Sequence, residues 1–399
     1  MLVTIISFIL ILGFMIFVHE MGHFVMARVM GVKAEEFGFG FPPRVFGVVF
    51  NEHTKKWDFI RGNKKIGKRK DTIYSLNWIP LGGFVKILGE DGDPIKDKHG
   101  KKDPQSFSSQ AIWKRIVILA AGVVMNFLGA ILILSFGFFI GLPQAVEDDA
   151  SGRLKDPKIQ VVEIAKESPA SSMGLAPGDQ LVALAAGNEI VAAKSVDEAV
   201  VFLERHAGSE VVVEVKRGDD IIYVTGTPRL NPPEGQGALG IVLTKTAIVS
   251  YPFFESIERG VIYSFDIAVL IVKSLGILVK DLVTTGKTAA DVSGPVGIFF
   301  FANQAAEMGL AYILQFAAVL SINLAIINIL PLPALDGGRI AFLILEKIKK
   351  SPVSLGLEQK VHLVGFYLLI LLMAVVTIKD LIKFRDSFAS LARRIQDLF

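Results

Sequence analysis

The chain contains four long stretches in which apolar residues follow one another with few interruptions. They cover residues 1–30, 113–143, 310–335 and 361–379. Each reaches the roughly 18–20 residues that a helix needs to cross the hydrocarbon core of a bilayer. The pattern therefore predicts a polytopic α-helical membrane protein with about four transmembrane helices, followed by a C-terminal tail over 380–399.

A fifth apolar segment, residues 253–283, carries charges at regular intervals. Arg259, Asp266, Lys273 and Lys280 recur every seven residues and so lie on one helical face. This spacing favours an amphipathic helix lying on the membrane surface. The alternative is a fifth span whose charges turn inward.

Two regions between the spans have strand character. In 155–232, apolar and polar residues alternate over 210–216 and 221–225 around a helical segment near 195–206, which predicts a small inserted α+β domain.

The other region is the loop 31–112, where two short apolar runs, 72–78 and 84–88, flank Pro80-Leu-Gly-Gly83. They predict a β-hairpin. Trp78 suits a membrane interface, so we expect the hairpin to associate with the membrane.

Composition narrows the picture further. The chain is 52% hydrophobic and has no cysteine, which excludes disulfides, thiol nucleophiles and cysteine zinc sites. A formal net charge of only +3 gives no reason to expect a nucleic-acid partner. Lys and Arg outnumber Asp and Glu in 24–112 and in 337–360, whereas acids predominate in 151–250. The positive-inside rule then places the two basic loops in the cytoplasm and the α+β domain outside, although the basic tail after Ile378 points the other way.

The first apolar stretch ends in a metal-binding pattern. His19 and His23 are spaced i, i+4 and lie on one helical face, where they can bind one zinc ion, and Glu20 beside them can take a proton from metal-bound water. Such side chains are costly in lipid and therefore favour a functional role. The plainer alternative is a polar helix end that faces the headgroups.

A catalytic zinc ion needs a third protein ligand, and Asp336 is the best candidate. It is the only acid between Glu307 and Glu346, and it follows an uncharged span that reaches the same membrane side as His19. Nearby, Asn323 and Asn328 could hydrogen bond a substrate backbone, although asparagines also join transmembrane helices. Asp336 could instead be a loop acid that caps a turn. The remaining histidines, His53, His99, His206 and His362, are expected to be loop or interfacial residues.

The two motifs together, His-Glu-x-x-His at 19–23 and Asn-x-x-Pro-x-Pro-x-Leu-Asp-Gly at 328–337, resemble the site-2 protease family of intramembrane zinc metalloproteases. The closest branch is that of the bacterial regulator of sigma-E proteases. Further segments agree: 74–86 is similar to its membrane-associated β-loop, 122–126 to its second span, 293–297 to a segment before its third span, and 173–179 to its PDZ domain.

The resemblance implies a role for each matching residue. One Zn²⁺ per chain would be held by His19, His23 and Asp336, with Glu20 as general base. Substrate would be bound by Asn328 and by the strand formed by Gly82, Gly83, Phe84, Val85 and Lys86, which would pair with the unwound substrate.

The resemblance also implies partners and a location. The substrates would be single-span membrane proteins, either an anti-sigma factor or leftover signal peptides. The protein would lie in the bacterial inner membrane, with the PDZ-like domain on the outer side and the active site near the cytoplasmic face.

This chain departs from the family in having one PDZ-like domain where some relatives have two, and in an added charged stretch around 51–70 that has no assigned role. Two other functions compete. A non-catalytic scaffold would bind partner tails through the PDZ-like domain, but its metal motif should then have lost a member. A metal transporter would need polar residues through the whole membrane depth, whereas here they gather at one end.

Overall fold

The structure is a computed structural model that describes residues 2–51, 54–62, 71–90, 103–146, 154–218, 220–286 and 293–383. His53, His99, the basic run 64–70 and most of the predicted tail lie outside these residues. The chain forms two compact units. The first, here called the helical unit, comprises 1–135, 257–306 and 313–399, and the second, called the inserted unit, comprises 136–256 and 307–312.

Five helices in the described residues are long and apolar enough to cross a membrane. They are α1 (Leu2–Val29), α2 (Ile112–Ile140), α5 (Phe253–Thr285), α7 (Leu310–Ile329) and α9 (Leu355–Lys383). The prediction of a polytopic helical protein is therefore confirmed.

The predicted third span, 310–335, ends earlier than expected. Helix α7 stops at Ile329, because Pro331 and Pro333 lack the N–H groups that would continue it. A separate short helix, α8 (Asp336–Lys349), then begins at the candidate metal ligand. Helix α9 begins at Leu355 and not at 361.

A second short helix, α6 (Pro295–Met308), was also not predicted. Its first turn is capped by a residue from another helix: the buried carboxylate of Asp380 in α9 accepts hydrogen bonds of 2.8 Å from the N–H groups of Gly294 and Gly297. Orphan N–H groups at a helix start need such partners. The segment 293–297 thus joins α6 to α9.

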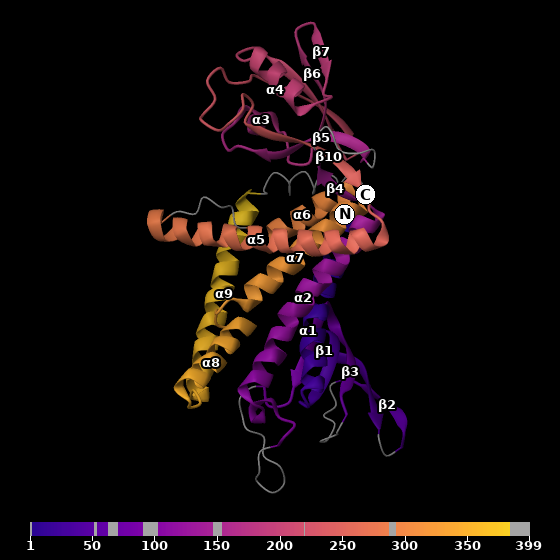
Figure 1. The fold of residues 1–399 in the computed structure, drawn as a ribbon, viewed down its shortest axis with the longest axis vertical. Helices are drawn as coiled ribbons and strands as arrows, with labels where there is room; N and C mark the ends of the chain where they lie inside the picture. Colours follow the sequence, from indigo (N-terminus) through magenta and orange to yellow (C-terminus); the bar gives the residue numbers. More distant parts are fainter. Residues whose placement is uncertain are drawn as a thin grey trace. The chain divides into compact units, whose positions relative to one another are not determined.

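Helix α5 crosses the direction of α2 and α9 and does not run along them (Figure 1). It contacts α2 through Phe265 and Phe127, whose ring centroids lie 5.0 Å apart. It also contacts α7, where the Gln315 side chain donates a hydrogen bond to the Tyr263 hydroxyl at 3.1 Å. This crossing geometry is compatible with the predicted surface helix, while the length and hydropathy of α5 also suit a span.

The helical unit contains a sheet in the order β2-β1-β3, formed by β1 (Ala34–Asn51), β2 (Lys56–Arg61) and β3 (Ile73–Ile87). The predicted hairpin within 72–88 is wrong in detail. Residues 73–87 form one bent strand, in which Gly82 has a φ of +86°, and both of its halves pair with β1. Gly38 of β1, for example, pairs with Phe84 and with Ser75.

The inserted unit is a sheet in the order β4-β10-β5-β6-β8-β9, with β7 paired to β6. Its strands are β4 (Leu142–Ala145), β5 (Leu154–Ile164), β6 (Gln180–Ala186), β7 (Glu189–Ala192), β8 (Val211–Arg217), β9 (Asp220–Gly226) and β10 (Ile241–Val249). Helices α3 (Pro169–Met173) and α4 (Val196–Arg205) complete it. The sheet extends beyond the predicted range 155–232, because β4 and β10 pair with each other and β10 pairs with β5.

Candidate active site

Helix α1 presents both histidines of the motif to the interior of the helical unit. His19 and His23 are 7% and 6% exposed, and their Nε2 atoms lie 3.1 Å apart. One helical turn separates the two residues, so both rings lie on the same face of the helix, where they meet edge to face with an interplanar angle of 85°. The i, i+4 spacing therefore produces the geometry that the sequence predicts.

Asp336 reaches the same point from the first residue of α8. Its Oδ2 atom lies 3.0 Å from Nε2 of His19 and 3.4 Å from Nε2 of His23. Gly337 and Gly338 make this approach possible, because a Cβ atom at either position would collide with the backbone at the end of α7 and in the following loop. The Leu-Asp-Gly-Gly motif thus folds α8 tightly back toward α1.

The outer nitrogens of both imidazoles have partners on α2. Nδ1 of His23 lies 2.9 Å from the carbonyl oxygen of Ile118, which can only accept, so this nitrogen carries the proton. Nδ1 of His19 lies 3.2 Å from the side-chain amide of the fully buried Asn126. A metal on Nε2 leaves the His19 proton on Nδ1, and Asn126 must then turn its Oδ1 atom toward it.

Gly122 explains why α2 can come so close. A Cβ atom there would lie 2.5 Å from Nε2 of His23 and 2.7 Å from Cε1 of His19. Asn126 follows one turn later, and its backbone carbonyl accepts a hydrogen bond of 2.8 Å from the Ser321 hydroxyl of α7. The segment 122–126 therefore supplies both the space and the support for the histidines.

These three side chains fit a zinc ion. Tetrahedral zinc with ligand bonds of 2.0–2.2 Å keeps its ligand atoms roughly 3.3 Å apart, and the observed separations lie around that value. Among the described residues, this is the group of acids and histidines whose ligand atoms converge. Burial raises the pKa of the Asp336 carboxyl, but hydrogen bonds from His19 and His23 bring it below its ordinary value, so Asp336 remains the carboxylate that a metal requires.

Glu20 lies beside the cluster and has an unexpected partner. Its Oε2 atom accepts a hydrogen bond of 3.1 Å from the backbone N–H of Val85 in β3. The same part of β3 packs closely on α1, since a Cβ atom at Gly82 would lie 2.5 Å from Ile16. The structure therefore brings the predicted substrate strand to the predicted general base.

The other predicted substrate-binding residues have fewer contacts with the rest of the site. Asn323 and Asn328 lie in the last two turns of α7, partly exposed, and neither side chain has a hydrogen-bond partner among the described residues. Five residues of helix separate them by about 140°, so they do not share one face. Phe84 is partly buried, and Lys86 forms an ion pair of 2.7 Å with Glu35.

Sequence reasoning missed the role of His362 in α9. Its Nδ1 atom accepts a hydrogen bond of 2.8 Å from the backbone N–H of Ala334, two residues before Asp336. Ala334 has a φ of +70°, an uncommon value for a residue with a side chain. Gly365, one turn further on, lets α9 pack against Pro333. Helix α9 thus holds the loop that carries the third ligand.

A zinc-binding cluster on a long apolar helix places the chain in the class of membrane metallopeptidases. The sequence profile of peptidase family M50 matches residues 7–62 and 62–372. The chain therefore belongs to peptidase family M50, and it is a multi-pass membrane protein and a zinc metalloprotease.

Curated relatives agree over almost their whole length. The CPE1693 protein of Clostridium perfringens, provisionally named a zinc metalloprotease, is 34% identical over 92% of this chain and 95% of its own. The zinc metalloprotease RasP of Geobacillus kaustophilus is 29% identical over 96% of this chain and 98% of its own. The regulator of sigma-W protease RasP of Bacillus subtilis is 28% identical over 95% and 98%.

Proposed function

We propose that this protein hydrolyses peptide bonds within the transmembrane segments of single-span proteins. In this proposal His19, His23 and Asp336 hold the zinc ion and Glu20 is the general base. The observation that carries it is the position of Glu20, which lies on a membrane helix between the metal cluster and the outer edge of β3.

A zinc ion held by His19, His23 and Asp336 would supply a water of lowered pKa and would polarise the substrate carbonyl. Glu20 would accept a proton from the attacking water and would later deliver it to the leaving nitrogen. The N–H of Val85 orients one carboxylate oxygen of Glu20, which leaves the other oxygen to face the water. The partners on α2 keep both imidazoles in the tautomer that presents Nε2.

The outer edge of β3 provides a place for the substrate. Residues 83–87 pair with β1 on one side, and no other described strand pairs with them on the opposite side. Because the N–H of Val85 points away from β1, strand alternation also directs the N–H of Gly83 outward. An unwound substrate segment can add to this edge, which stabilises the extended form that hydrolysis needs. Asn328 and Asn323 would contact the same segment from α7.

The relatives and the charge pattern suggest the substrates and the location. The name of the B. subtilis relative refers to the regulation of a sigma factor. An anti-sigma factor is therefore the first substrate to test here, and leftover signal peptides are the second. The location would be the bacterial inner membrane, with the inserted unit outside and the active site near the cytoplasmic face, as the basic loops indicate.

The position of the cut tests this function. A tagged single-span reporter with a short outer stub would be incubated with the purified full chain in detergent, and the products identified by mass spectrometry. We expect a cut inside the apolar segment, and none with Glu20→Gln. Cuts confined to the soluble flanks, or equal cutting by the variant, would contradict the proposal. If zinc is bound and several reporters stay intact, the scaffold function gains support.

A further inference from the structure

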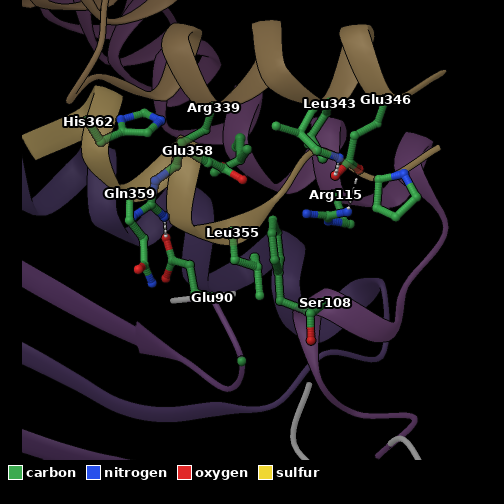
Figure 2. Close-up of a pocket in the computed structure, with 15 residues that line it drawn as sticks. Glu90, Ser108, Arg115, Arg339, Leu343, Glu346, Leu355, Glu358, Gln359 and His362 are labelled. Carbon is green, nitrogen blue, oxygen red and sulfur yellow. Dashed lines mark hydrogen bonds and ion pairs between the residues drawn. The ribbon is translucent and has the colours of Figure 1, made fainter. Parts of the chain in front are cut away.

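A cavity lies in the helical unit, apart from the metal cluster (Figure 2). It has a volume of about 300 Å³ and lies among the first turns of α2 and α9, helix α8 and the segments that follow β3. Its walls carry two arginines and three glutamates: Arg115, Arg339, Glu90, Glu346 and Glu358. The charged side chains of the cavity therefore include one more acid than base, and they lie beside apolar residues such as Leu119 and Leu343.

Four of these five charges are already paired. Arg115 forms an ion pair of 3.2 Å with Glu346, and Arg339 forms a close ion pair with Glu90. Figure 2 shows the Glu358 carboxylate between these two pairs. The charges around it include Glu346 as well as Arg115 and Arg339, and its side chain makes no hydrogen bond or ion pair with any residue in the described part of the chain. Glu358 can therefore accept a cation without breaking either pair.

The cavity lies at the end of the proposed substrate edge. Strand β3 ends at Ile87, Gly89 turns the chain with a φ of +70°, and Glu90 enters the cavity wall. Glu90 lies five positions after Val85, which contacts the general base. At about 3.3 Å per residue, an extended substrate reaches the cavity roughly three to five residues from the bond that is cut.

The chemistry of the substrate flank matches this cavity. Single-span proteins carry Lys and Arg next to the cytoplasmic end of their transmembrane segment. We propose that this cavity binds a Lys or Arg side chain on the cytoplasmic flank of the substrate, with Glu358 as its ion-pair partner. The inference rests on the proposed function and adds a specificity site that fixes the register of the substrate on β3. His362 lines the same cavity and accepts the hydrogen bond from Ala334, so a side chain in the cavity would lie beside the residue that holds the loop before Asp336.

Cross-linking tests the site without relying on catalysis. The chain has no cysteine, so a single cysteine can be introduced in the Glu20→Gln background. Glu358→Cys would be paired with reporters that carry one cysteine at successive flank positions, and Lys360→Cys serves as the control. Lys360 is exposed, does not line the cavity, and lies about 200° further around the helix. We expect a short bifunctional maleimide to join residue 358, but not residue 360, to flank positions three to five residues from the cut. Equal cross-linking at 358 and 360 would overturn the proposal.

Reversal of charge provides the second test. Reporters with a basic, neutral or acidic residue at the flank position would be compared by the ratios of their cleavage rates. With the natural chain, we expect the basic reporter to be cut roughly three- to tenfold faster than the acidic one, as for a partly exposed ion pair. Glu358→Arg should invert this ratio, and Lys360→Gln should keep it.

The outcomes separate this inference from the proposed function. If the natural chain cuts all three reporters equally in a Glu20-dependent way, the flank site is wrong and the protease function stands. If no reporter is cut, the proposed function fails, and cross-linking alone decides whether the cavity receives the flank.

Discussion

Both units of this protein have an apolar core, but among the described residues the converging cluster of buried histidine and acid side chains lies in the helical unit alone. The inserted unit has an apolar core that includes Leu184, Val213 and Leu239, each 1% exposed or less. The helical unit exposes large apolar residues such as Leu132 and Leu368, at 70% and 60%, to the side where lipid would lie. Its buried residues include His19, His23, Asn126 and Asp380.

This difference associates the metal centre with the buried polar residues of the helical unit. A buried polar group is costly unless it has a partner, and in the helical unit most of these partners come from another helix. Asn126 supports His19, the Ile118 carbonyl holds His23, and Asp380 caps α6. Apolar burial stabilises the inserted unit, whereas in the helical unit the buried polar contacts build the metal centre.

The comparison predicts its largest effect at the third ligand. Asp336→Ala removes one of three protein ligands, so we expect bound zinc to fall well below one per chain and cleavage to be lost. Metal analysis of the purified protein, together with the reporter assay, checks this. Asp103→Ala, in the same unit but outside the cluster, should keep both. Full zinc content in Asp336→Ala would exclude Asp336 as a ligand.

A smaller loss is expected at the support of His19. Asn126→Ala leaves Nδ1 of His19 without its partner, and the loss of such an outer contact typically weakens metal affinity about 10- to 100-fold. Competition with a zinc chelator measures this affinity. Asn126→Asp restores an acceptor and should recover most of the affinity. If the alanine and aspartate variants have the same zinc affinity, the contact between Asn126 and His19 contributes to packing only.

In the inserted unit, truncation of a buried side chain should lower the free energy of unfolding and leave the zinc content unchanged. Leu184→Ala empties a core position, which costs about 2–5 kcal/mol of unfolding free energy. Ile190→Ala, at an exposed position of the same unit, should cost almost nothing. Limited proteolysis between 155 and 249 reports the change, and zinc content should stay at the natural level. Loss of zinc in Leu184→Ala would show that the two units are not independent.

The smallest effect concerns α5, which differs from the other long helices in its direction. A surface helix keeps both ends on one side of the membrane, so single cysteines at Phe254 and Val283 should both react with an impermeant maleimide from the outer side. A cysteine at Leu132, within α2, should not react. Labelling of one end alone would identify α5 as a fifth span.

The sequence was sufficient for the elements that depend on local pattern. The apolar stretches predicted the long helices, and the i, i+4 spacing predicted that His19 and His23 share a face. Asp336 was found by elimination, since it is the one acid that follows an uncharged span at the same depth. These inferences succeed because helix periodicity and the cost of polar groups in lipid depend on residues that are close together in the sequence.

The contacts between elements could not be predicted in this way. Nothing near Val85 indicates that its N–H reaches Glu20, and His362 resembles an interfacial histidine until Ala334 is placed beside it. The sequence predicted a hairpin, whereas in the structure β1 pairs with both halves of β3. The bend between these halves lies at Gly82, which packs against Ile16 of α1, and this contact is not visible in the local sequence. Such contacts depend on how α1, α2, α9 and β3 pack together, and one sequence does not specify this packing.

Zinc binding and catalysis can be separated at Glu20. The full chain and its Glu20→Gln variant would be purified side by side, analysed for zinc and assayed on the same reporter. We expect about one zinc per chain in both proteins, and cleavage by the natural chain alone. Equal cleavage by both proteins, or loss of zinc in the variant, would contradict the assignment of Glu20 as the general base beside an independent metal centre.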